Sequence, residues 1–238
     1  MEKLIQGIHR FRETYFRSNT ELFSRLSKGQ NPEALFITCS DSRVVPDLIT
    51  QTNPGDLFVI RNAGNLIPSH LSAPDSGEAA TIEYAVGVLK VRDIIVCGHT
   101  GCGAMHALMN PENLEHLPRV KDWLGHAWTT REIVSKRYRC ETPEAMSRVT
   151  AEENVLVQLT HLRSHPSVSA ALERGDVKLH GWMFKIETGQ VFAYDPVAGQ
   201  FLSTEQPAPY QDPAAVVKPR QSLPGPEPEP YWTASMDQ

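Results

Sequence analysis

The sequence predicts an α/β fold built on a central parallel sheet. Three short apolar runs, at residues 34–38, 57–60 and 94–97, lack the alternation of apolar and polar residues that marks a half-exposed strand. Such runs are typical of strands buried on both faces of a parallel sheet. Between the second and third runs, residues 79–89 place apolar side chains at helical spacing, which indicates a strand–helix–strand crossover.

The first 30 residues are predicted to form a helical arm. An apolar stripe at helical spacing is formed by Leu4, Ile8, Phe11 and Tyr15. A second short helix is expected at residues 21–26, and Gly29 and Pro32 end the helical pattern before the first strand. An exposed stripe of this size is unfavourable on a monomer, so we expect the arm to reach across a second subunit.

Helices are expected to cover the faces of the sheet. Asp75 or Ser76 would cap the helix at residues 79–89, and another helix would follow Gly103. Residues 117–141 are charged and favour helix, and an amphipathic helix is expected at residues 155–162.

Two strand-like stretches, residues 177–186 and 190–194, close this part of the chain and are joined by a turn at residues 188–189. We therefore expect an antiparallel edge strand on the sheet and one α/β domain over residues 31–204. Residues 205–238 are rich in proline and poor in apolar side chains, which predicts a disordered tail.

Composition argues against several classes of protein. A net charge of −5 and a pI near 6.0 give no basis for nucleic-acid binding. No apolar run approaches the roughly 20 residues that span a membrane, and the first residues do not resemble a signal peptide. We therefore expect a cytoplasmic protein.

The four cysteines, too few for a disulfide framework, are expected to be reduced thiols or metal ligands: Cys39, Cys97, Cys102 and Cys140.

Two motifs follow predicted strands directly. TCSDSR, at residues 38–43, follows the first strand, and CGHTGCG, at residues 97–103, includes the end of the third. Ligands bind at the carboxyl ends of parallel strands, so Cys39, His99 and Cys102 are expected to form a zinc site of two sulfurs and one nitrogen. A site of this kind keeps one position open for water. The glycines of the second motif leave space beside the metal: Gly98, Gly101 and Gly103.

Each of these residues taken singly has a plainer interpretation. A free cysteine usually acts as a small buried hydrophobe, and a lone histidine is more often a core or surface group. Two motifs at two strand ends, each with donors suited to the same metal, favour a metal site. Cys97 lies inside the strand, and both it and Cys140 are interpreted as structural.

CSDSR, followed about sixty residues later by GHTGCG, resembles the signature of β-class carbonic anhydrases, and the stretches at residues 54–65 and 78–91 are also similar to that family. The resemblance covers roughly residues 1–202 and is greatest for the plant-like branch. It implies zinc bound by the two cysteines and the histidine, and the reversible hydration of carbon dioxide to bicarbonate. It also implies that Asp41 and Arg43 form a pair.

The pair has a physical rationale. Two thiolates cancel the charge of Zn²⁺, so water bound to the metal needs help to ionise. Asp41 can accept a hydrogen bond from that water or hydroxide, and Arg43 can hold Asp41 ionised and oriented while zinc-bound hydroxide attacks carbon dioxide. The alternative is a surface ion pair or a helix cap.

The resemblance also implies a substrate pocket that crosses a dimer interface, formed by Gln30, Phe58, Tyr84 and Gly103. Phe58 and Tyr84 could equally be core aromatics. Phe36 stands where the branch regulated by bicarbonate carries a tryptophan, so we expect no allosteric bicarbonate site. The protein is expected to be a homodimer or a higher homo-oligomer.

Residues 4–16 and 48–51 resemble cyanobacterial members packaged in carboxysomes. If the chain is packaged in this way, its tail could bind a carboxysome scaffold protein through Tyr210, Tyr231 or Trp232; a tail without a partner is the alternative. Two other functions stay open at this point: a related zinc hydrolase acting on carbon disulfide or carbonyl sulfide, and a non-catalytic, zinc-stabilised protein that binds a scaffold.

Overall fold

The computed structural model describes residues 1–140 and 142–204. These residues belong to two compact units, of which one contains Met1–Gln30 and the other begins at Asn31. Within the described part of the chain, every helix is too short or too polar to span a lipid bilayer. The predicted tail, with Tyr210, Tyr231 and Trp232, lies outside the described residues.

The N-terminal unit is helical, as predicted. It comprises α1 (Glu2–Phe11), a π-helical segment η1 (Arg12–Phe16) and α2 (Thr20–Leu26). The aromatic end of the apolar stripe packs on α2, with ring centroids 5.8 Å apart for Phe11–Phe23 and 6.2 Å apart for Tyr15–Phe23. Leu4 and Ile8 are 64% and 66% exposed, so no described residue of this unit covers that part of the stripe.

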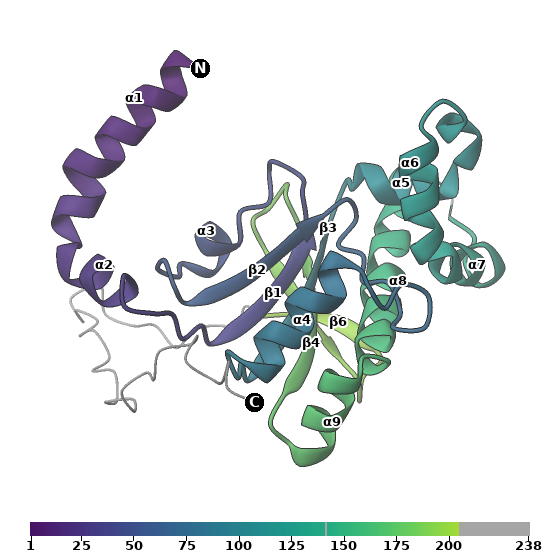
Figure 1. Ribbon diagram of the computed structural model, residues 1–238. Helices are drawn as coiled ribbons and strands as arrows, with labels where there is room; N and C mark the ends of the chain where they lie inside the picture. The colour runs from purple at the N-terminus through teal and green to yellow at the C-terminus, as the bar shows by residue number, and fades with distance from the viewer. Residues whose placement is uncertain (141, 205–238) are drawn as a thin grey trace, which may run out of the picture. The chain divides into compact units, whose positions relative to one another are not determined.

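The second unit contains a six-stranded sheet in the order β2-β1-β3-β4-β5-β6 (Figure 1). Its strands are β1 Ala34–Cys39, β2 Leu57–Asn62, β3 Asp93–His99, β4 Lys178–Phe184, β5 Val191–Asp195 and β6 Gln200–Ser203. The pairs β2–β1, β1–β3 and β3–β4 are parallel, and β4–β5 and β5–β6 are antiparallel. The predicted fold class is confirmed, and the antiparallel edge contains β6 in addition to the expected strand.

The helices of this unit, with two short helical turns marked η, are α3 Pro46–Thr50, α4 Gly77–Gly87, α5 Gly103–Met109, η2 Pro111–Leu114, α6 Pro118–Leu124, η3 Gly125–Ala127, α7 Trp128–Arg137, α8 Pro143–Arg163 and α9 Pro166–Arg174. Ser76, one of the two expected caps, accepts a hydrogen bond from the Ala79 N–H at 3.1 Å. The helix expected at residues 155–162 is the second half of α8. It begins much earlier, where Thr142 accepts from the Ala145 N–H at 3.1 Å.

The two faces of the sheet carry different cores. On one face, β1 and β3 contribute Leu35, Ile37 and Val96 to the larger cluster, which α4, α8 and α9 help to form. On the other face, Phe36 and Ile95 belong to a smaller cluster that Ile49 of α3 partly covers. Alternate residues of each central strand are therefore buried on opposite faces, which explains the continuous apolar runs in the sequence.

Helix α8 lies close to β3 and β4 because both strands have a glycine beneath it. A Cβ at Gly98 of β3 would lie 2.9 Å from Val155 Cγ2 and 2.7 Å from Met183 Sδ. A Cβ at Gly181 of β4 would lie 2.9 Å from Val155 Cγ1. These glycines bring a buried face of α8 next to the strand that ends in His99.

We predict that Gly98→Ala lowers the free energy of unfolding by about 1–3 kcal/mol, because the added methyl group overpacks the contact with Val155 and Met183. Urea denaturation followed by circular dichroism measures this change. Gly87→Ala is the control, since a Cβ there meets no atom within 4 Å and the position is helical. The control should be neutral or slightly stabilising; an equal loss in both variants would contradict the packing argument.

Candidate metal centre

Cys39, His99 and Cys102 come together at the carboxyl ends of two neighbouring strands. Cys39 is the last residue of β1, His99 is the last residue of β3, and Cys102 directly precedes α5. One ligand atom from each residue lies within 4.8 Å of the others, and all three side chains are buried. The parallel pairing of β1 and β3 sets this arrangement, because it places both strand ends at the same edge.

The ring of His99 is oriented as a metal ligand would be. Its Nδ1 lies 2.9 Å from the carbonyl oxygen of Thr100, so Nδ1 carries the proton and donates it. Nε2 then presents its lone pair; it is buried and has no hydrogen-bond partner among the described residues. Leaving a buried polar atom unpaired costs free energy, and a cation between Nε2 and the two sulfurs removes this cost.

The two sulfurs form a pair that shares a proton. A hydrogen bond from Cys102, with a smaller contribution from the Gly64 N–H, outweighs the effect of burial and lowers the pKa of Cys39 to about 4. The same bond to Cys39, together with burial, raises the pKa of Cys102. One thiolate is therefore present at neutral pH, and a divalent cation can replace the remaining proton. These residues fit a metal that prefers sulfur and nitrogen ligands.

Asp41 and Arg43 form a close ion pair beside this cluster. Arg43 donates to Asp41 through Nε at 2.9 Å, through Nη2 at 2.7 Å and through its backbone N–H at 3.0 Å. Hydrogen bonds from the Arg43 side chain, followed by that from its backbone, hold the pKa of Asp41 far below its usual range. Asp41 Oδ2 lies 4.0 Å from His99 Nε2, so the carboxylate stands next to the cluster while it faces Arg43.

Arg43 also ties the two motifs together, because its Nη2 donates to the carbonyl oxygen of Gly101 at 3.1 Å. The carboxylate of Asp41 is mostly shielded, with 17% of its side chain exposed, whereas Arg43 is half exposed. The pair thus lies where the first strand end meets the loop that carries the other two candidate ligands.

Two residues of this region were not predicted from the sequence to belong to the site. Arg61 of β2 donates through Nε to the Cys39 carbonyl at 3.2 Å and through Nη2 to the Asp41 carbonyl at 2.8 Å. The N–H of Gly64 lies 3.4 Å from Cys39 Sγ. The stretch RNAGN could have indicated these two residues. It spans the end of the second strand and is a third polar, glycine-containing motif at the same edge of the sheet.

The proposed pocket residues do not all meet within one chain. Gly103 begins α5 next to Cys102, but Phe58 pairs with Leu35, four residues before the end of β1. Because four residues of strand span about 13 Å, Phe58 lies about that far from the strand end that carries Cys39. Phe58 and Tyr84 contact each other with ring centroids 5.9 Å apart, and Tyr84 is 36% exposed. Gln30 is an exposed residue of the N-terminal unit.

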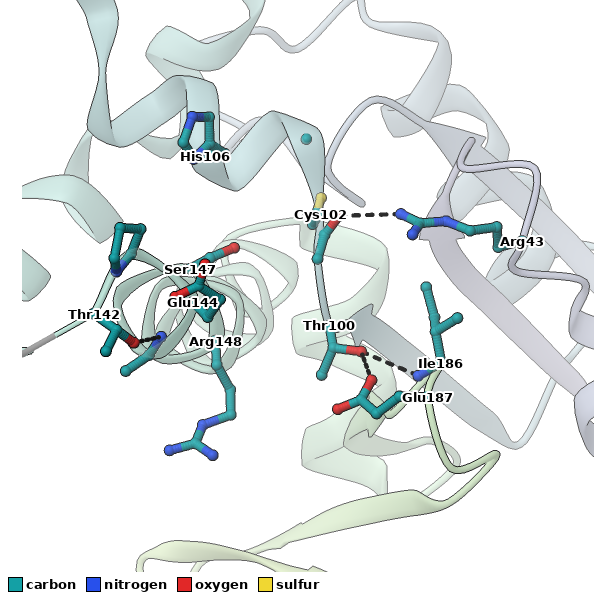
Figure 2. Close-up of a pocket in the computed structure, with 14 residues that line it drawn as sticks. Arg43, Thr100, Cys102, His106, Thr142, Glu144, Ser147, Arg148, Ile186 and Glu187 are labelled. Carbon is teal, nitrogen blue, oxygen red and sulfur yellow. Dashed lines mark hydrogen bonds between the residues drawn. The ribbon is translucent and has the colours of Figure 1, made fainter.

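A cavity of about 840 Å³ opens beside Cys102 and Arg43 (Figure 2). Thr100 and Glu187 form part of its wall, where the Thr100 hydroxyl donates to Glu187 Oε2 at 2.6 Å and accepts from the Ile186 N–H at 3.0 Å. His106 and Arg148 also line the cavity. The cavity gives small polar molecules access to the edge of the candidate metal centre.

A family model described as carbonic anhydrase matches residues 34–191, which include every residue of the metal cluster and the Asp41–Arg43 pair. The chain belongs to the carbonic anhydrase family. Among relatives, a carbonic anhydrase of Synechocystis sp. is 50% identical over 206 residues, which are 86% of this chain and 75% of the relative. A carbonic anhydrase of Pseudomonas aeruginosa is 45% identical over 203 residues, covering 85% of this chain and 91% of the relative.

Solved structures place the chain in the β class. The structure of the β-carbonic anhydrase CcaA matches with a TM-score of 0.83 and 50% identity, over 85% of this chain and 98% of the other. A tetrameric β-carbonic anhydrase of Sordaria macrospora matches with a TM-score of 0.72 and 28% identity, over 81% and 95% of the two chains. This chain is a β-class carbonic anhydrase close to cyanobacterial members, and the reaction of the family is carbon dioxide hydration.

Proposed function

We propose that the protein catalyses the zinc-dependent, reversible hydration of carbon dioxide to bicarbonate and a proton, with zinc held by Cys39, His99 and Cys102. The observation that carries this proposal is the unpartnered, buried Nε2 of His99, which faces two sulfurs within 4.8 Å. Zinc bound there would supply a Lewis acid that activates water for attack on carbon dioxide.

Asp41 and Arg43 would prepare the reacting water. Asp41 is ionised at neutral pH, and Arg43 lowers its pKa further, so the carboxylate can only accept hydrogen bonds. It would accept one from the attacking water and turn a lone pair of that oxygen towards the substrate carbon. Arg43 occupies the other side of the carboxylate with two side-chain donors, which keeps Asp41 turned away from the metal ligands.

The substrate pocket requires a second copy of the chain. Phe58 and Tyr84 lie towards the opposite end of β2 from the metal centre, so they would contact substrate only in a neighbouring subunit, with Gln30 as a hydrogen-bond donor. The exposed side chains of Leu4 and Ile8 support an arm that packs on that neighbour. We therefore propose a homodimer as the smallest active unit; the related enzyme of Sordaria macrospora is tetrameric.

Packaging in carboxysomes and binding of a scaffold protein by the tail stay predictions from the sequence. Their support is the similarity to carbonic anhydrases of cyanobacteria, such as that of Synechococcus elongatus, which is 46% identical over 192 residues. The cytoplasmic location and the absence of a bicarbonate regulatory site also stay predictions. The prediction of no bicarbonate regulatory site is based on Phe36, which is fully buried against Trp182.

Stopped-flow measurement of carbon dioxide hydration tests the proposal. Protein stripped of metal should be inactive, and activity should return in proportion to added zinc and level off at one zinc per chain. Zinc-loaded protein that turns over carbon disulfide or carbonyl sulfide but not carbon dioxide would support the specialised hydrolase instead. Full zinc occupancy without any turnover would indicate a structural metal.

A further inference from the structure

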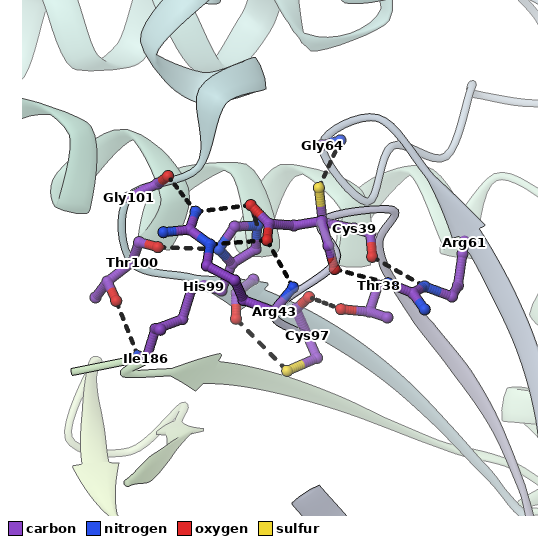
Figure 3. Close-up of polar contacts among 12 residues, drawn as sticks. Thr38, Cys39, Arg43, Arg61, Gly64, Cys97, His99, Thr100, Gly101 and Ile186 are labelled. Atoms are coloured by element: carbon purple, nitrogen blue, oxygen red, sulfur yellow. Dashed lines mark hydrogen bonds and ion pairs between the residues drawn. The ribbon is translucent and has the colours of Figure 1, made fainter. Parts of the chain in front are cut away.

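The peptide between Ala63 and Gly64 connects Trp123 to a sulfur of the metal centre. The N–H of this peptide, on Gly64, lies 3.4 Å from Cys39 Sγ (Figure 3). Its carbonyl oxygen, on Ala63, accepts a hydrogen bond from Trp123 Nε1 at 2.8 Å. A hydrogen bond received at the oxygen of a peptide polarises its N–H, so the indole of Trp123 strengthens the bond that reaches the sulfur.

The next peptide is held by α8. The carbonyl oxygen of Gly64 accepts a hydrogen bond from Nδ2 of Asn154 at 3.0 Å. The orientation of this amide is fixed, because its Oδ1 accepts from Gln158 Nε2 at 2.9 Å. Gln158 in turn accepts the Ile67 N–H at 2.8 Å. Asn154 and Gln158 are fully buried, so this network is shielded from competing water.

Gly64 has little freedom to move away from the sulfur. Its φ of +84° lies in the left-handed region, and an added Cβ would lie 3.0 Å from both Ala104 Cβ and Met105 Cε. Those atoms belong to the first turn of α5, which begins directly after Cys102. The backbone of Gly64 is therefore confined between α5 and the amide of Asn154, with its N–H directed at Cys39.

We propose that Trp123 and Asn154 are positioning residues that act through the two peptides of Gly64 to maintain an N–H···S hydrogen bond on Cys39. This inference rests on the proposed zinc site. The bond withdraws electron density from the thiolate, so the sulfur donates less charge to the metal and leaves it a stronger Lewis acid. Hydrogen bonds to ligand atoms are a general means by which proteins tune bound metals.

Substitution of Trp123 by phenylalanine tests the proposal, because it removes the indole N–H and keeps an aromatic ring. In cobalt-substituted protein, the sulfur-to-cobalt charge-transfer band should move to longer wavelength, since a less hydrogen-bonded thiolate gives up charge more easily. Zinc affinity, measured by competition with a chelator, should fall about threefold, because Cys39 is held less firmly in its ligand position; this loss is smaller than the tenfold or more typical of a group that contacts a ligand directly. Trp128→Phe is the matched control, because Trp128 is a half-exposed tryptophan of α7 that stacks on Arg131.

Asn154→Asp provides a second variant. It keeps the oxygen that accepts from Gln158 and replaces the donor that holds the Gly64 carbonyl with a carboxylate oxygen that repels it. We expect a larger shift of the band in the same direction and about tenfold weaker zinc binding. Val157→Ala, which trims a buried side chain of the same helix without changing a hydrogen bond, controls for general loosening of α8.

The outcomes separate this inference from the proposed function. A band at the same wavelength in wild type, Trp123→Phe and Asn154→Asp would overturn the inference while leaving the zinc site intact. Equal shifts in the variants and their controls would also overturn it, because the effect would then come from loss of rigidity alone. If wild-type protein itself binds neither cobalt nor zinc, it is the proposed function that fails.

Discussion

Cys39→Ser is expected to abolish both stoichiometric zinc binding and carbon dioxide hydration. Cys39 supplies the thiolate of the pair, since its pKa is lowered to about 4, whereas a serine hydroxyl keeps its proton at neutral pH. The variant would leave Cys102 and His99 as a two-ligand site. Loss of a group that only supports a ligand weakens metal binding by about 10–100-fold, so loss of the ligand itself should exceed that range.

The measurements are zinc content by mass spectrometry after extensive dialysis and hydration rates by stopped flow. Cys97→Ser is the matched control, since it makes the same chemical change two residues before His99. Burial raises the pKa of Cys97 to about 12, and its thiol donates to the Gly98 carbonyl at 3.5 Å, a bond that serine can keep. This control should retain zinc and activity. One zinc per chain in purified Cys39→Ser would refute the assigned ligand set.

Strands β1 and β3 could be predicted because they are buried along almost their whole length, and helix α4 could be predicted because its buried residues recur at helical spacing. Short elements could not be predicted from the sequence. Helix α3 has five residues and β6 has four, too few to show a periodicity, and Pro166 at the start of α9 looks like a break in α8. The first half of α8 was also missed, because it carries Glu152 and Glu153 where an amphipathic pattern would place apolar residues on the buried face. Glu153 is nevertheless buried, and its carboxylate accepts from the hydroxyl of Tyr138.

The metal ligands could be predicted because each lies in a short motif at the end of a buried strand, where local sequence and topology agree. The supporting groups could not be found in this way. Asn154 and Gln158 lie 90 or more residues from the loop that they hold, and a polar residue in a helix usually faces solvent. Both side chains are nevertheless fully buried, where Asn154 donates to the Gly64 carbonyl and Gln158 accepts from the Ile67 N–H.

Asp41→Asn is expected to lower kcat/KM for hydration by about 10²–10⁴-fold, the range typical of a group that manages a proton in the transition state. Zinc content should not change, because Asp41 is not one of the three clustered ligands. The asparagine side chain has the same shape, but it is uncharged and one of the two acceptor oxygens is replaced by a donor NH₂ group. It therefore pairs poorly with Arg43 and has one acceptor fewer for the hydrogen bond from water. Asp47→Asn, at an exposed aspartate of α3, is the control and should be fully active.

Arg43→Gln separates the contribution of the charge of Asp41 to activity from the contribution of its orientation. Without Arg43 the pKa of Asp41 rises towards its ordinary value, which is still acidic, so the carboxylate remains ionised at neutral pH. What the variant loses is the fork of donors that turns Asp41 away from His99 Nε2, 4.0 Å distant. If acceptance of a hydrogen bond by the carboxylate is the essential contribution, Arg43→Gln should retain more activity than Asp41→Asn at the same zinc content. Full activity in zinc-loaded Asp41→Asn would instead show that the metal site activates water without this pair.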